Sequence, residues 1–156
     1  MRDDVALVTG AGSGIGRAVA LAFAESGAAV VVADISTSDG EETVQLIREN
    51  GGTAAFHYCD VSRSSDVEAM VGAAVDRFGR LDFAANIAGV HNAAPEALAD
   101  ASEETWDRII AVNLKGVFLC MKYELRQMAR QGGGAIVNMA SVAGLLAEPG
   151  SSTASP

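Results

Sequence analysis

Strand-like and helix-like segments alternate along this 156-residue chain, with glycines between them. Short runs rich in valine and alanine predict strands over residues 5–9, 29–34, 53–58, 82–86 and 135–139. Between these runs, apolar residues recur at helical spacing, which predicts helices from Ile15 to Gly27, from Ser38 to Gly51, from Ser65 to Gly79 and from Ser102 to about Arg130. Strands separated by helices form right-handed crossovers into a parallel sheet. The order of elements therefore predicts an α/β fold with helices on both faces of the sheet.

The amino-acid composition argues against some classes of binding partner. Hydrophobic residues make up 49% of the chain and charged residues 20%, enough to bury the core of one domain, and we expect a single domain over residues 1–156. Eleven Lys and Arg against 20 Asp and Glu give a net charge of −9. This balance argues against binding to nucleic acid or to an anionic membrane surface. No apolar run approaches the roughly 18 residues of a membrane span.

The cysteines and histidines predict no metal site. Cys59 and Cys120 are far apart in sequence, and no Cys or His lies at ligand spacing from His57 or His91. We therefore expect both cysteines to be core residues of a reduced, cytoplasmic protein.

Serines are placed to begin the later helices. Ser38 and Glu41 have the spacing of a capping box, as do Ser65 and Glu68. Ser102 is followed by two glutamates, which favour the positive end of a helix dipole. We expect these three serines to be N-caps.

A cluster of glycines follows the first strand, in Thr9-Gly10-Ala11-Gly12-Ser13-Gly14-Ile15-Gly16. Its spacing is not G-x-G-x-x-G, because counting from Gly10 the last position falls on Ile15. Backbone N–H groups at a helix start still favour a pyrophosphate, and the absence of Cβ atoms allows close approach. The alternative is a tight turn that binds no ligand.

Asp34 ends the second strand, 18 residues after Gly16. A carboxylate there can accept hydrogen bonds from both ribose hydroxyls of an adenosine. It would repel a 2′-phosphate, which favours NAD over NADP. The alternative is a strand-end Asp that caps a turn.

Five motifs in order resemble those of the short-chain dehydrogenase/reductase family. Thr9 to Gly16 resembles its cofactor loop, and Asp60–Val61 resembles its adenine-contacting pair. Asn86-Ile87-Ala88-Gly89 is similar to its Asn-Asn-Ala-Gly motif, with Ile87 departing at the second place. Asn113 and Ser141 resemble its catalytic Asn and Ser. The resemblance runs from about Val5 to Ser152.

The resemblance implies a Rossmann-type, doubly wound sheet of five strands in the order 3-2-1-4-5, in three α/β/α layers, without the last strands of the family fold. It implies hydride transfer between a nicotinamide cofactor and a small alcohol or carbonyl substrate. Asp34 favours NAD as that cofactor. Asn113 and Ser141 are then the catalytic candidates, with Ser141 on the substrate oxygen. Asn113 lies among apolar helix positions, so its amide needs hydrogen-bond partners. The implied cofactor-binding residues are Gly10, Gly12, Ser13, Gly14, Ile15, Gly16, Asp34, Ile35, Asp60, Val61, Asn86, Ala88 and Gly89.

One family motif has no counterpart. The family's Tyr-x-x-x-Lys acid/base pair would begin near position 154, where this chain has Ala154, and Tyr58 and Tyr123 match it in neither place nor spacing. We therefore expect a C-terminally truncated form, in which the fifth strand is an open sheet edge and stability is marginal. Family members form homo-oligomers through the long helix and a segment beyond Pro156, so we doubt that this chain does.

Two other functions compete with an active oxidoreductase. The chain could be an inactive module that holds a dinucleotide or a partner subunit. It could also be a methyltransferase, because those enzymes place glycines after the first strand and an acid after the second. The Thr9 to Gly16 spacing, the Asn86 motif and the pair of Asn113 and Ser141 argue against the methyltransferase.

Overall fold

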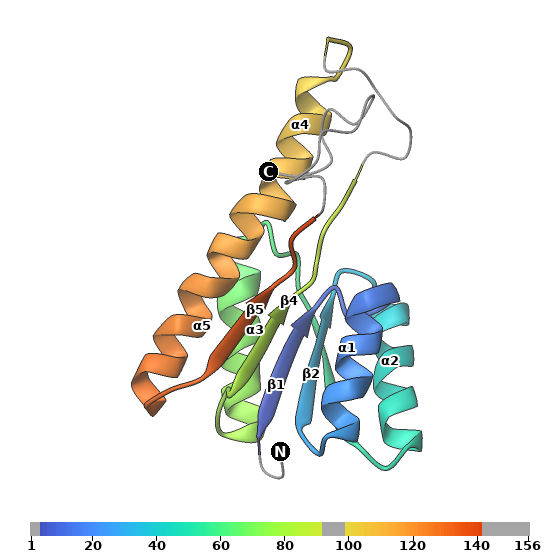
Figure 1. The fold of residues 1–156 in the computed structure, drawn as a ribbon, viewed down its shortest axis with the longest axis vertical. Coiled ribbons are helices and arrows are strands. Elements are labelled where there is room, and N and C mark those ends of the chain that lie inside the picture. The colour runs from blue at the N-terminus through green and yellow to red at the C-terminus, as the bar shows by residue number, and fades with distance from the viewer. Residues whose placement is uncertain (1–3, 92–98, 142–156) are drawn as a thin grey trace.

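A five-stranded parallel sheet forms the centre of the molecule (Figure 1). The structure is a computed structural model and describes residues 4–91 and 99–141. The sheet order is β3-β2-β1-β4-β5, as the sequence predicted. The strands are β1 (Val5–Thr9), β2 (Ala29–Asp34), β3 (Thr53–Tyr58), β4 (Phe83–Asn86) and β5 (Ala135–Asn138). The helices are α1 (Gly14–Glu25), α2 (Thr37–Glu49), α3 (Ser64–Phe78), α4 (Glu103–Ile109), η1 (Ile110–Gly116) and α5 (Val117–Gln131).

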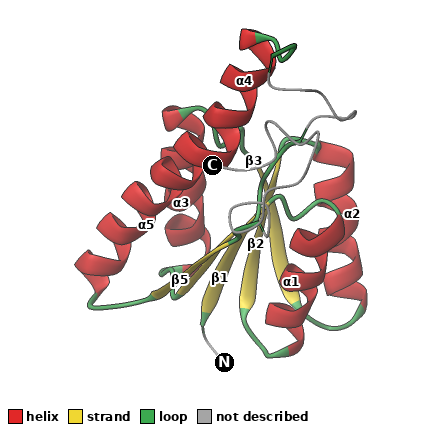
Figure 2. Ribbon diagram, turned by 45° about the horizontal axis from the view of Figure 1, so that its top comes forward, coloured by secondary structure: helices red, strands yellow, loops and turns green. Residues whose placement is uncertain are grey.

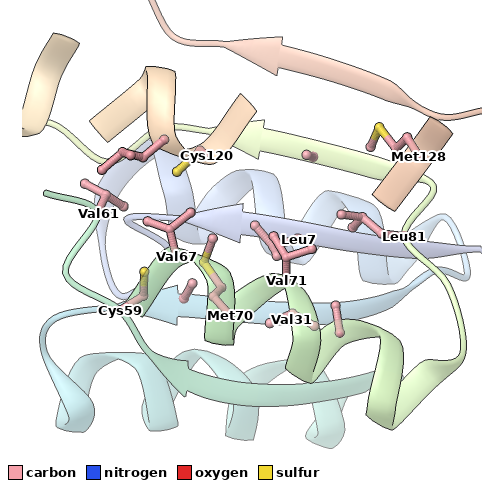
Figure 3. Close-up of a cluster of buried hydrophobic side chains, with 14 residues drawn as sticks. Leu7, Val31, Cys59, Val61, Val67, Met70, Val71, Leu81, Cys120 and Met128 are labelled. Atoms are coloured by element: carbon pink, nitrogen blue, oxygen red, sulfur yellow. The ribbon is translucent and has the colours of Figure 1, made fainter. Parts of the chain in front are cut away.

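Helices cover both faces of the sheet (Figure 2). Alternate residues of β1 and β2 point to opposite faces, so Leu7 and Val31 enter one apolar cluster while Val8 and Val32 enter the other. The first cluster is completed by α3 and α5, and Figure 3 shows its side chains converging on Leu7. The second cluster is completed by α1 and α2. Burial on both faces explains why the central strands read as continuous apolar runs.

Glycines end the helices as expected, whereas two of the three N-caps are elsewhere. Gly27, Gly51 and Gly79 all have positive φ after a helix end. Ser102 accepts a hydrogen bond from the Thr105 N–H, which confirms it as an N-cap. The expectation for Ser38 was wrong, because α2 begins earlier and its N-cap is Ser36. The expectation that Ser65 is an N-cap was also wrong, because α3 begins at Ser64 and its N-cap is Arg63.

The long helix is interrupted at its middle. The sequence predicted one helix from Ser102 to about Arg130, but its middle seven residues, η1, form a π-helix. A π segment widens the turn and re-aims its side chains, and such segments are frequent at functional sites. Asn113 lies at the centre of η1.

The fifth strand borders the sheet. Among the described strands, β5 pairs with β4 alone, and Val137 on it is 62% exposed. Leu114, Phe118 and Leu125 on η1 and α5 are also more than half exposed. Among the described residues, this side of the molecule therefore presents apolar surface.

A pair of glycine substitutions tests how tightly α1 packs on the loop before it. A Cβ at Gly16 would overlap the carbonyl oxygen of Gly10, whereas a Cβ at Gly72 in α3 meets open space. We expect Gly16→Ala to lower the free energy of unfolding by about 1–3 kcal/mol. Gly72→Ala should raise it by about 0.5–1 kcal/mol through helix propensity. Urea denaturation measures both, and equal effects would contradict the close approach.

Candidate functional site

A cavity of about 740 Å³ opens at the carboxyl ends of the strands. This is where parallel α/β sheets bind their ligands, and the volume lies in the range of small-molecule sites. Eleven of the fifteen candidate residues line it, namely Gly10, Ser13, Gly14, Ile15, Gly16, Asp34, Ile35, Asp60, Val61, Ala88 and Gly89. The other lining residues are Tyr58, Cys59, Ser62, Ile87, Val90, Arg108, Ala111, Val112 and Met139.

The glycine loop forms one wall of this cavity. Gly10 and Gly14 have φ angles of 65° and 52°, the left-handed region that favours glycine. A Cβ at Gly10 would lie 2.8 Å from the Cα of Ala88, so this position also needs glycine for space. The side chain of Ser13, the N-cap of α1, makes no capping hydrogen bond. Because the first N–H groups of a helix lack intrahelical partners, the start of α1 can bind an anion.

Side chains from two other elements hold the loop in place. Thr43 of α2 is fully buried, and its hydroxyl donates to the Ala11 carbonyl at 2.9 Å. The Nε of Arg17 donates to the Gly12 carbonyl at 2.9 Å, and its guanidinium also pairs with Glu42 at 2.6 Å. Sequence reasoning missed Thr43, Arg17 and Glu42. The Thr43–Ala11 and Arg17–Glu42 contacts span 32 and 25 residues and leave no local pattern.

Asp34 connects the glycine loop to the turn after β2. Its Oδ2 accepts a hydrogen bond from the Gly12 N–H at 2.8 Å, and its Oδ1 accepts one from the Ser36 N–H at 2.9 Å. The carboxylate therefore does cap a turn, the alternative weighed for it. Each oxygen keeps a second acceptor site, so Asp34 can still accept hydrogen bonds from a ligand.

The segment after β3 forms a second wall. Asp60 Oδ1 accepts hydrogen bonds from both the N–H and the hydroxyl of Ser62, which shapes the turn into α3. Val61 is buried and packs beside Gly116 of η1. Burial raises the pKa of the Cys59 thiol to about 12, so this lining thiol is protonated and unreactive near neutral pH.

The segment after β4 is anchored on β1. Thr9 is 1% exposed, and its hydroxyl oxygen accepts hydrogen bonds from the N–H groups of Ile87 and Ala88, at 3.1 and 3.2 Å. Ala88 and Gly89 then reach the cavity wall. Asn86 lies beneath that wall, where it is 2% exposed and donates to Glu124 and Asn138.

Asn113 is a structural tie in this structure. Its carboxamide accepts from the Val90 N–H and donates to the Val90 carbonyl, both at 2.8 Å. This supplies the partners that the sequence required of a largely apolar helix face. Ser141 is exposed and follows β5 by three residues. Within residues 4–91 and 99–141, four of the fifteen candidate residues do not line the cavity, namely Gly12, Asn86, Asn113 and Ser141.

Comparison with known proteins settles the family. A family model described as short chain dehydrogenase matches residues 4–154. The chain belongs to this family. An oxidoreductase of Thermotoga maritima that is named as uncharacterized is 50% identical over 93% of this chain and 56% of its own length. The cyclohexanol dehydrogenase of Acinetobacter sp. (strain SE19) is 44% identical over 91% of this chain and 56% of that protein.

Solved structures agree with the sequence relatives. The crystal structure of levodione reductase matches with a TM-score of 0.93 and 35% identity, over 98% of this chain and 60% of that one. The crystal structure named as that of a putative short-chain dehydrogenase/reductase from Burkholderia xenovorans matches with a TM-score of 0.88 and 39% identity, over 97% of this chain and 62% of that one. This short-chain dehydrogenase chain spans about half the length of the curated relatives it matches.

The described residues contain neither a candidate membrane span nor a candidate metal site. Across residues 4–91 and 99–141, no helix combines the length and apolarity needed to cross a bilayer. In the same ranges, no three His, Cys, Asp or Glu side chains gather in a way that could hold a metal ion.

Thr9 provides a test of the anchor between β1 and the cavity wall. Thr9→Val keeps the shape but leaves the N–H groups of Ile87 and Ala88 without their acceptor, so we expect the free energy of unfolding to fall by about 1–3 kcal/mol. Thr9→Ser keeps the hydroxyl and should cost about 1 kcal/mol for the lost methyl. Urea denaturation of both variants measures the difference. A Val variant as stable as the Ser variant would contradict this role.

Proposed function

We propose that this chain binds NAD in the cavity and serves hydride transfer between the nicotinamide and an alcohol or carbonyl substrate. One observation carries the proposal: the start of α1 and the carboxylate of Asp34 border the same cavity and are joined through the Gly12 N–H. An anion site and a hydroxyl acceptor that border one cavity suit the pyrophosphate and the adenosine ribose of a dinucleotide. Family membership supports a nicotinamide dinucleotide as the ligand.

The residues present fit the rest of the cofactor. Ile35 and Val61 offer apolar surface for an adenine ring, and Asp60 lies beside Val61. Ile87 to Val90 continue the lining past Gly10, where the nicotinamide half would lie. The glycines matter for this fit, because Gly14 borders open space that a ligand phosphate could approach.

The charges near Asp34 favour NAD over NADP. A 2′-phosphate would lie against the Asp34 carboxylate and be repelled. Arg17 is the nearest base of α1, but its guanidinium is engaged by the Gly12 carbonyl and Glu42. Arg108 is the only Lys or Arg among the described lining residues, and it comes from α4 rather than from the turn after β2.

The chemistry follows from what each group can do. When bound, the nicotinamide accepts or donates the hydride. We propose that Ser141 donates a hydrogen bond to the substrate oxygen and stabilises the charge that develops there. Asn113 positions the Val90 backbone on the cavity wall through its two hydrogen bonds.

The names of relatives support a ring-bearing alcohol or ketone as substrate class. Two of them are a cyclohexanol dehydrogenase and a 2,5-dichloro-2,5-cyclohexadiene-1,4-diol dehydrogenase.

The Tyr-x-x-x-Lys pair of the family does not occur in residues 1–156, where tyrosines stand at 58 and 123. Tyr123 bonds to Ser64 of α3 at 2.8 Å, and it is absent from the described cavity lining.

Asp34→Asn tests the ribose assignment. Hydrogen bonds to a charged acceptor contribute about 1.5–3 kcal/mol, so we expect NAD affinity to fall roughly 10- to 100-fold. NADP affinity should fall less or rise, because the repulsion is removed. Asp76→Asn on the exposed surface of α3 is the matched control. Isothermal titration calorimetry of the native chain and both variants measures the six affinities, and unchanged NAD affinity in Asp34→Asn would remove the assignment.

A further inference from the structure

A buried carboxyl group lies beneath the cavity, on α5. Glu124 is 0% exposed, and its Oε2 accepts a hydrogen bond from Asn86 Nδ2 at 3.0 Å. The same Asn86 nitrogen donates its other hydrogen to Asn138 Oδ1 at 2.9 Å. The three side chains therefore join α5 to the carboxyl ends of β4 and β5. Neither the sequence motifs nor the proposed chemistry uses Glu124.

Within residues 4–91 and 99–141, two buried acceptor atoms of this cluster have no hydrogen-bond partner. They are Glu124 Oε1 and Asn86 Oδ1, which belong to side chains already bonded to each other. If Glu124 were ionised, it could only accept hydrogen bonds. Glu124 Oε1 and Asn86 Oδ1 would then both stay buried without a donor. Leaving a buried polar group unsatisfied is costly, and more so when the group is charged. One proton on Oε1 supplies the missing donor.

We propose that the folded protein binds a proton at Glu124, that in this neutral form its O–H donates to Asn86 Oδ1, and that the neutral form acts as a positioning residue for the dinucleotide cavity. The carboxylic acid and the carboxamide then exchange two hydrogen bonds, one in each direction. The positioning part rests on the proposed function. The neutral state of Glu124 does not.

Among the residues that the structure describes, no cation contacts Glu124 to hold an ionised form. On β4 the group that faces it is the carboxamide of Asn86, which also donates to Asn138 on β5. On α5 the nearest titratable neighbour is the Cys120 thiol, whose pKa is raised by burial and further by Glu124. The thiol of Cys59 faces Cys120 from the segment after β3. The charged residues between α3 and α5 line a separate surface groove, namely Glu68, Asp76, Arg126 and Arg130.

The pKa of Glu124 agrees with this arrangement. Burial raises it from 4.5 to about 7, and the hydrogen bond from Asn86 opposes part of that rise. The folded protein therefore binds this proton more tightly than the unfolded chain does. The contribution to stability is complete below pH 4.5 and is lost as pH rises through 7.

The cluster supports two segments of the cavity wall. Asn86 is the last residue of β4 and is followed by Ile87, Ala88 and Gly89, all of which line the cavity. Asn138 is the last residue of β5 and is followed by Met139, which lines it as well. Ionisation of Glu124 would place a negative charge against the unpaired Oδ1 of Asn86, the side chain that links Glu124 to Asn138. The two strand ends would then lose their common tie, and the wall would loosen.

Urea denaturation from pH 5 to 8 tests the protonation state. Glu124→Gln replaces the O–H by an N–H₂ that can donate to Asn86 Oδ1, so it imitates the neutral acid at every pH. We expect the folding equilibrium constant of the native chain to fall about 50- to 100-fold relative to that of Glu124→Gln over this range. Glu68→Gln, at an exposed position of α3, controls for the loss of one acid. A native chain whose pH dependence matched that of Glu124→Gln would overturn the proposal.

NAD binding at the same pH values tests the positioning role. We expect the affinity of the native chain to fall at least threefold between pH 6 and 8, while that of Glu124→Gln stays level. Coincident profiles would overturn the positioning role. A native chain that bound no NAD at any pH would instead refute the proposed function, and the denaturation profile would still decide the state of Glu124.

Discussion

The contact between the first turn of α1 and the loop before it determines the geometry of the site. Gly16 in the helix lies directly against the Gly10 carbonyl, and Gly10 lies against Ala88 after β4. Both contacts require the absence of a Cβ. They bring the end of β1, the start of α1 and the segment after β4 to one place. A cavity with a helix start on its wall is the consequence.

The same peptide units that face a ligand are also held from behind. Gly12 is bonded at its N–H by Asp34 and at its carbonyl by Arg17, and Thr43 holds the Ala11 carbonyl. These bonds fix the loop before any ligand binds, and a preorganised site avoids the entropy of ordering it on binding. Asp34 thus has two tasks, since it shapes the loop and presents acceptor sites to the cavity.

Local patterns predicted much of the candidate site, and the reason is visible in particular residues. Gly10, Asp34, Asp60 and Ala88 each lie at the end of a strand or just after one, and the carboxyl ends of parallel strands meet at one edge of the sheet. Placement was harder for residues inside elements. Asn86 and Asn113 point to protein partners, the first to Glu124 and the second to Val90, which neither their type nor their spacing reveals.

The sequence by itself determined the order of strands and helices, the glycine turn and the five-stranded parallel sheet, because hydrophobic period and glycine placement act over a few residues. Tertiary structure alone decided which caps are used, where the long helix turns to π geometry, and which polar groups meet in the interior. Glu124 shows why. In the sequence it is one acid among 20, and only the packing of α5 against the sheet removes it from water and bonds it to Asn86, which in turn bonds to Asn138.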